Sequence, residues 1–321
     1  MLSLRKIAVL LAALALAVTV VACGDDDSES GGGGGSASAD TPTDLSGSVA
    51  IDGSSTVQPF AESASEFFNE ENPDVQITVG GAGTGDGFEK FCRGEIAISD
   101  ASRPIEDDEK AACKKGGVDY TEVQVANDGL TVVTNKGTAI DCLTTAQLKK
   151  IFGPKATATN YKEVDPKLPD QEISLFTPGS ESGTFDYFTD EINGEEGVQR
   201  EKGVQTSADD NQIVTGIEGQ EGAMGYFGFS FYEQNQDKLN AVKVDGGDGC
   251  VAPSSATVQD GSYKPLGRPL FMYVSNAELK KPEVKGFVQY AVDNQQQISE
   301  AAKIVPLSPD QQSKAKQALG G

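Results

Sequence analysis

The amino-acid sequence predicts an α/β protein in which short strands alternate with helices. Short apolar or alternating runs, such as residues 49–51 and 75–79, precede glycine- or hydroxyl-rich turns. Apolar residues at helical spacing follow most of these turns, so that strand, turn and helix recur along the chain. A third observation is the long extended segment 120–135, interrupted at residues 127–129, which could carry the chain from one lobe to another.

Composition excludes several classes of function. The 321 residues include 26 Lys and Arg against 49 Asp and Glu, which gives a formal net charge of −23. A nucleic-acid partner is therefore not expected, because such proteins need basic patches. The sequence contains no histidine, which removes Ser-His and Cys-His catalysis and the usual zinc sites. We expect a globular protein that is not an enzyme and that needs no cofactor or metal.

The first 22 residues are predicted to be an export signal. Arg5 and Lys6 precede the apolar run 7–22, which is short for a membrane span of about 20 residues. The run ends directly before Cys23 and resembles the lipobox of bacterial lipoproteins, so we expect an acylated Cys23 as the mature N-terminus. An ordinary secretory signal is the alternative. Residues 24–46, with five consecutive glycines, have the composition of a flexible linker.

Cysteine spacing predicts two disulfides. Besides Cys23 the chain has Cys92, Cys113, Cys142 and Cys250, and an even number in an exported protein indicates disulfides. Four cysteines allow three pairings. We favour Cys92 with Cys113, which flank a local segment, and Cys142 with Cys250, which bracket about a hundred residues.

Each strand–turn–helix unit has its own signals. The first turn, residues 52–56, precedes a helical stripe that includes Phe60, Ala64 and Phe68, with Pro59 in the first helical turn. The second turn, 80–87, is glycine-rich but lacks a Walker A lysine and the GxGxxG spacing, so nucleotide binding is not expected.

Two further turns complete the pattern. Residues 99–104 follow the predicted strand 95–98, and residues 177–184 follow the predicted strand 173–176. Helix N-termini and hydroxyl groups at such turns favour a bound anion. Near the C-terminus, residues 270–274 are predicted to form a second crossover strand before a helical stripe that begins at Val284.

Five motifs resemble those of PstS-type phosphate-binding proteins, the extracytoplasmic receptors of the bacterial phosphate ABC importer. They are Asp52-Gly-Ser-Ser-Thr-Val57, Gly83-Thr-Gly-Asp-Gly-Phe88, Ile98-Ser-Asp-Ala-Ser-Arg-Pro-Ile105, Ser182-Gly-Thr-Phe-Asp-Tyr-Phe188 and Gly222-Ala-Met-Gly-Tyr-Phe-Gly228. The resemblance implies the type II periplasmic-binding-protein fold, with two lobes, two crossover strands and a ligand cleft. We place lobe one at residues 47–128 plus 268–321 and lobe two at 129–267.

The resemblance also implies function and partners. We expect a receptor, anchored to the cell membrane by lipid, that delivers inorganic phosphate to permease and ATPase subunits, with a monomer as the default state. The residues it implies as phosphate donors are Ser55, Thr56, Thr84, Ser182, Gly183 and Thr184. Asn211 is a weaker candidate, because a role as a helix cap or turn residue is the favoured alternative.

Two departures from the family pattern affect the expected site. The family places an arginine where this chain has Pro178, and an aspartate that accepts the phosphate proton near the position of Ser102. We therefore expect Arg103 to supply the positive charge and Asp100 to be a possible acceptor, with Ser102 of the same loop as a further phosphate-binding residue. A surface ion pair with Glu106 or Asp107 is the alternative role of Arg103.

Two other functions remain as alternatives. A receptor for sulfate or molybdate would use the same kind of turns. An extracytoplasmic phosphate-ester hydrolase is disfavoured, because histidine, a convincing metal cluster and a GxSxG elbow are missing from the sequence.

Overall fold

The structure, a computed structural model, describes residues 45–180 and 182–320. The predicted signal peptide, Cys23 and nearly all of the predicted linker lie outside these residues. None of the described helices is long and apolar enough to span a lipid bilayer.

A mixed sheet of nine strands runs through the described residues in the order β2-β1-β3-β12-β4-β8-β6-β7, and β9 also pairs with β4. A second sheet has the order β11-β10-β5. The strands are β1 (Gly47–Gly53), β2 (Val75–Val79), β3 (Ile98–Ala101), β4 (Tyr120–Asn135), β5 (Cys142–Thr144), β6 (Ser174–Thr177), β7 (Val204–Thr206), β8 (Ala223–Gly228), β9 (Leu239–Ala241), β10 (Lys243–Asp245), β11 (Cys250–Val251) and β12 (Gly267–Ser275).

Helices alternate with most of these strands, as the sequence predicts. They are α1 (Gln58–Glu71), α2 (Thr84–Cys92), α3 (Asp107–Gly116), α4 (Thr145–Phe152), α5 (Tyr161–Val164), α6 (Gly183–Phe188), the π-helix η1 (Thr189–Asn193), α7 (Asp210–Glu218), α8 (Phe229–Glu233), α9 (Ser255–Gln259), the 3-10 helix η2 (Glu278–Lys280), α10 (Pro282–Asp293), α11 (Gln295–Ala301) and α12 (Pro309–Ala318).

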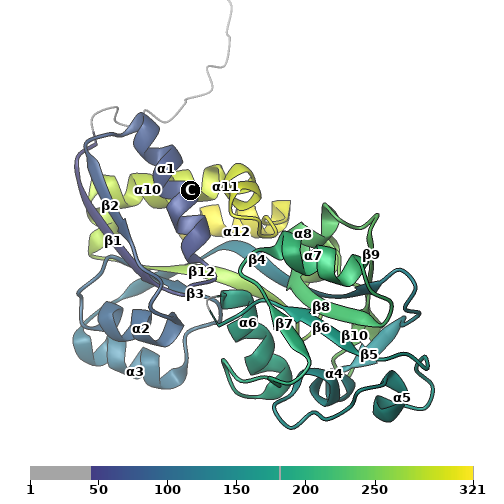
Figure 1. Cartoon of the computed structure of the whole chain (residues 1–321). Coiled ribbons are helices and arrows are strands. Elements are labelled where there is room, and N and C mark those ends of the chain that lie inside the picture. Colours follow the sequence, from purple (N-terminus) through teal and green to yellow (C-terminus); the bar gives the residue numbers. More distant parts are fainter. Residues whose placement is uncertain (1–44, 181, 321) are drawn as a thin grey trace, which may run out of the picture. The chain divides into compact units, whose positions relative to one another are not determined.

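The first half of the large sheet is covered on both faces. Helices α1 and α10 lie on one face of β2, β1 and β3, and α2 and α3 lie on the other (Figure 1). Phe60 and Phe287 are fully buried in the core of the first face, and Phe88 is buried with Tyr273 in the core of the second. These apolar stripes fix the position of each helix relative to the turn that precedes it.

The second half of the sheet is also enclosed. Tyr226 and Phe227, neighbours on β8, face opposite sides, because successive side chains of a strand alternate. Tyr226 packs in a core with α4 and α6, and its ring stacks on Phe188 of α6 with centroids 3.7 Å apart. Phe227 packs in a core with α7 and α8.

Strand β4 links the two halves. Residues 120–129 pair with β12, and Leu130–Thr134 pair with β8. The expected interruption at residues 127–129 does not occur, because backbone pairing with β12 continues through Asn127, Asp128 and Gly129. The second predicted crossover strand is present as β12, which begins at Gly267, three residues earlier than expected.

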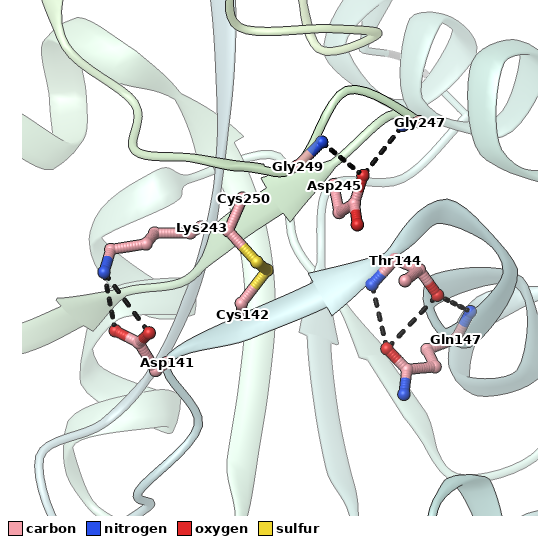
Figure 2. Close-up of a disulfide and its surroundings, with 9 residues drawn as sticks. All are labelled: Asp141, Cys142, Thr144, Gln147, Lys243, Asp245, Gly247, Gly249 and Cys250. Atoms are coloured by element: carbon pink, nitrogen blue, oxygen red, sulfur yellow. Dashed lines mark hydrogen bonds and ion pairs between the residues drawn. A yellow bond between two sulfur atoms is a disulfide. The ribbon is translucent and has the colours of Figure 1, made fainter.

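Both predicted disulfides are confirmed. Cys92 at the end of α2 is bonded to Cys113 in α3, and Cys142 in β5 is bonded to Cys250 in β11. The second disulfide therefore ties the two strands that flank β10 in the small sheet (Figure 2). At the end of β10, the Asp245 carboxylate accepts hydrogen bonds from the backbone N–H groups of Gly247 and Gly249 in the following loop.

Candidate functional site

A cleft of about 750 Å³ lies where the turns after β1, β2 and β3 meet the start of α6. Its walls include Ser55, Thr56, Thr84 and Ser102 from the first half of the fold and Gly183 from the second. Strands β1, β2 and β3 are parallel, so their carboxyl ends meet at one edge of the sheet. Such an edge is the usual place for a ligand in α/β sheets.

The first turn places hydroxyl groups at the start of α1. The backbone N–H of Thr56 donates to Ser54 Oγ at 3.2 Å, and the carbonyl of buried Ser54 accepts from Val57 and Gln58. Pro59 occupies the first turn of α1, where a missing N–H has no consequence. Ser55 and Thr56 are only partly buried and line the cleft.

The second and third turns contact each other. Thr84, the first residue of α2, has its hydroxyl oxygen 3.2 Å from that of Ser102, and the Ser102 N–H donates to Thr84 Oγ1 at 3.3 Å. Gly83 before them has a φ of +110°, a conformation that favours glycine.

The fourth turn, residues 177–184, lies close to the first turn, residues 52–56. A Cβ added to Gly183 would lie 3.1 Å from both Ser55 Oγ and Thr56 Oγ1, so only a residue without a side chain fits easily at this distance. Ser182 caps α6 by accepting a hydrogen bond from the Thr184 N–H at 3.3 Å. The structure therefore brings together turns that are separated by more than a hundred residues in the sequence.

Asp100 lies beneath these turns at the end of β3. Its backbone carbonyl accepts from the Ser54 N–H at 2.9 Å. Its carboxylate is fully buried, and neither oxygen has a hydrogen-bond partner among residues 45–180 and 182–320. Burial, and to a smaller extent the charge of Asp52, raise the pKa of Asp100 well above its usual range.

Arg103 lines the cleft, but carboxylates hold its guanidinium. Two N–H groups donate to Glu109 at 2.8 Å each, and Nε lies 3.2 Å from Glu106. These hydrogen bonds to Glu109 raise the pKa of Arg103. The ion pair with Glu106 matches the alternative role that the sequence suggested.

Asn211 is not brought to the cleft. It lies at the start of α7, where both its backbone N–H and its side-chain amide donate to Asp209 at 2.9 Å. It lines a separate pocket with Phe176 and Gln205. Asp209 is the N-cap of α7, so Asn211 belongs to the capped first turn of this helix, which agrees with the helix-cap or turn alternative.

Arg268 is a cleft residue that the sequence reasoning missed. It stands opposite Asp128 in the β12–β4 pairing, and its Nε lies 3.3 Å from Asp128 Oδ2. Its Nη2 donates to Thr56 at 2.9 Å, and its guanidinium carbon lies 3.4 Å from the ring centre of Tyr187 on α6. The sequence did contain a signal for this residue. Position 268 is the first residue of the predicted return to lobe one, and a side chain at such a boundary can reach both lobes.

The opposite wall of the cleft is acidic. Asp186, Glu191 and Glu196 line it, and burial raises the pKa of each carboxyl group. The charge of Arg268 partly offsets this rise for all three groups. A bound anion therefore needs donors at close range, because the surrounding field is negative.

Comparisons with known proteins agree with this geometry. A family model described as a PBP superfamily domain matches residues 37–295. Protein SphX of Synechococcus elongatus is 44% identical over 262 residues, which cover 81% of this chain and 77% of the relative. The phosphate-binding protein PstS of Staphylococcus saprophyticus is 41% identical over 281 residues, which cover 85% and 86% of the two chains.

A solved structure, that of a possible phosphate binding protein from Planctomyces limnophilus, is 41% identical in sequence and aligns with a TM-score of 0.82. The alignment covers 86% of this chain and 98% of that chain. The predicted two-lobed α/β fold is thereby confirmed. From the matching family model and the identity to curated relatives, this chain belongs to the PBP superfamily and, within it, to the PstS-type phosphate-binding proteins.

Proposed function

We propose that this protein is the extracytoplasmic receptor of a phosphate ABC importer and binds inorganic phosphate in the cleft. The observation that carries this proposal is the meeting of the turns. Gly183 approaches the hydroxyl groups of Ser55 and Thr56, while Thr84 and Ser102 lie beside them in the same cleft. A family relative named phosphate-binding protein PstS supports the choice of ligand.

Hydroxyl and backbone N–H donors suit a phosphate oxyanion. Hydrogen bonds to an ionised acceptor are shorter and stronger than those between neutral groups. The proposed donors are Ser55, Thr56, Thr84, Ser102, Ser182, Gly183 and Thr184. Arg103 is left out of this set because Glu109 and Glu106 already hold its guanidinium.

Asp100 is the proposed acceptor for the proton that phosphate retains near neutral pH. Its backbone carbonyl accepts from Ser54 in the first turn, and its buried carboxylate oxygens are unpaired within the described part of the chain. In its ionised form, an unpaired Asp100 carboxylate would repel sulfate, which has no proton to donate, but could accept the P–OH of phosphate. This residue would therefore make the site selective.

The importer role brings further proposals. Phosphate would be held between lobe one, residues 47–128 plus 268–321, and lobe two, residues 129–267, with β4 and β12 crossing between them. A monomer anchored to the cell membrane through acylated Cys23 would present it to permease and ATPase subunits. Mass spectrometry of the native N-terminal peptide tests the anchor, and an unmodified Cys23 would refute it.

Calorimetry tests the function. The full chain is titrated separately with inorganic phosphate, sulfate, molybdate and a phosphate monoester, and the monoester sample is assayed for released phosphate. We expect saturable heat with phosphate, much weaker binding of sulfate and molybdate, and no hydrolysis. Tighter binding of another oxyanion, or turnover of the ester, would contradict the proposal.

A further inference from the structure

Few positive charges face the proposed phosphate site, and Pro178 brings none to the fourth turn. Among the described residues the cations that line the cleft are Arg103, Lys264 and Arg268. Lys264 is exposed, and the side chain of Arg103 is 36% exposed and bound to two glutamates. The side chain of Arg268 is only 16% exposed.

Burial matters because a charge acts more strongly where water is excluded. Arg268 starts from the crossover strand β12 and reaches the hydroxyl of Thr56, one of the proposed phosphate donors. On the other side its guanidinium stacks on Tyr187, four residues beyond Gly183. It therefore lies between the first and fourth turns, where the proposed donors from both lobes meet.

The guanidinium also has unused donors. Its Nε–H is directed to Asp128 and one Nη2–H to Thr56, and no other hydrogen bond of this group occurs within the described residues. Arginine has five N–H donors in a fixed fork that matches an oxyanion. The contacts to Asp128 and Tyr187 fix the plane of this fork before the ligand arrives, which reduces the entropy lost on binding.

We propose that Arg268 binds the phosphate directly and supplies the positive charge of the site, and that Asp128 is the residue that positions its guanidinium. This inference rests on the proposed function. Because Asp128 is buried against the guanidinium, an ionised Asp128 would offset part of the positive charge of Arg268. The site would then select phosphate by donor geometry rather than by bulk attraction.

The test is calorimetry of the full-length protein with inorganic phosphate. Variants Arg268→Ala and Arg103→Ala compare the two arginines of the cleft. Arg93→Ala is the matched control, because Arg93 is paired with Glu89 and Glu95 at the end of α2 and does not line the cleft. All three variants lose the same formal charge, so a change in the overall field affects them equally.

We expect Arg268→Ala to weaken phosphate binding about ten- to a hundredfold, since a hydrogen bond to a charged group is lost. Arg103→Ala and Arg93→Ala should remain within about threefold of the wild type. Arg268→Lys, which keeps the charge but not the fork, should recover part of the affinity. This recovery keeps the test valid if Arg268→Ala folds poorly, which thermal unfolding would detect.

Asp128 needs a separate comparison because it acts through Arg268. Asp128→Ala should weaken binding, and Asp128→Asn, which keeps an oxygen acceptor, should restore most of it. If Asp128 only neutralised charge, both variants would instead bind phosphate more tightly than the wild type.

The remaining outcomes are also decisive. Wild-type affinity in Arg268→Ala, or a larger loss in Arg103→Ala, would overturn this inference while leaving the phosphate receptor in place. A wild-type chain that gives no heat with phosphate would overturn the proposed function as well.

Discussion

Ionisation of the buried Asp100 side chain should destabilise the folded protein, and a single substitution can test this. Burial raises its pKa in the folded protein, whereas the unfolded chain releases the proton above about pH 4. Between about pH 4 and the pKa of Asp100 in the folded protein, Asp100 is protonated more often in the folded state than in the unfolded chain. The free energy of unfolding therefore falls as pH rises, by about 1.4 kcal/mol per pH unit from this group.

Asp100→Asn should remove this dependence. Without phosphate, the variant should gain stability relative to the wild type as the pH rises above about 4. The difference between their free energies of unfolding should be smallest near pH 4. Urea unfolding at several pH values in phosphate-free buffer measures it. Parallel stability curves for the two proteins would show that Asp100 does not titrate in this way.

The positions of the candidate residues were predictable where a local motif defines them. Ser55, Thr56, Thr84 and Ser102 follow the parallel strands β1, β2 and β3, so their convergence at one sheet edge follows from topology. Gly183 follows β6, which pairs in parallel with β8 in the other half of the sheet, so its approach to Ser55 depends on tertiary packing. The partners of an arginine depend instead on tertiary packing. Six residues separate Arg103 from Glu109, whereas Arg268 meets Thr56 across 212 residues, which no local pattern indicates.

At the scale of single elements, α2 depends on a close approach to β1. A Cβ on Gly87 would lie 2.5 Å from the Cα of Gly53 and 2.9 Å from Ser99 Oγ. Gly87→Ala should push α2 away from the sheet and lower the free energy of unfolding by about 1–3 kcal/mol. It should also weaken phosphate binding, because α2 carries Thr84. Thermal and urea unfolding check the first effect and calorimetry checks the second.

Gly85 is the matched control for Gly87. It lies on the same helix, and a Cβ there would meet no described atom within 4 Å. Gly85→Ala should keep or raise stability, because alanine has a higher helix propensity than glycine by about 1 kcal/mol. Equal losses in both variants would mean that the contact with Gly53 does not limit the position of α2.

The start of α6 separates capping from binding. Ser182 Oγ accepts from the Thr184 N–H, whereas no hydrogen bond of Thr184 Oγ1 occurs within residues 45–180 and 182–320. Ser182→Ala should lower stability by about 1 kcal/mol and weaken phosphate binding. Thr184→Ala should weaken binding about ten- to a hundredfold with little effect on the unfolding temperature. Wild-type affinity in both variants would remove them from the site.

Sequence patterns predicted most helices and strands, because the spacing of apolar residues indicates which face of a helix or strand is buried. The break expected in residues 120–135 was wrong for a physical reason. Asn127, Asp128 and Gly129 favour turns in isolation. Here the ladder with β12 pairs their backbone groups, and the amide of Asn127 binds the Pro306 carbonyl and Gln311 at 3.1 Å each. Tertiary contacts thus override the local preference.

At the scale of the whole molecule, the two disulfides should differ in their contribution to stability. The Cys142–Cys250 bond closes 108 residues and the Cys92–Cys113 bond closes 21. Loop entropy predicts losses of roughly 4–5 and roughly 3 kcal/mol when each pair is replaced by serine. Urea unfolding of the two double variants measures this. A larger loss for the short loop would show that local packing of α2 on α3 outweighs chain entropy.

The net charge of −23 leads to a prediction about kinetics. Phosphate approaches a cleft lined by Asp86, Asp186, Asp190, Glu191 and Glu196, so the long-range field repels it. Salt screens that field, because the Debye length falls from about 30 Å at 0.01 M to about 8 Å at 0.15 M ionic strength. The association rate of phosphate should therefore increase with salt. Donors in direct contact with the ligand are screened much less, so the dissociation rate should change little.

Stopped-flow tyrosine fluorescence can follow this reaction, since Tyr187 lies in the cleft and the sequence contains no tryptophan. The rates are compared at about 0.01 M and about 0.15 M ionic strength. The loss of affinity expected for Arg268→Ala should persist at both, because a contact with the bound ion acts at short range. An association rate that falls with salt would mean that the cations of the cleft, rather than the net negative charge, govern how phosphate reaches the site.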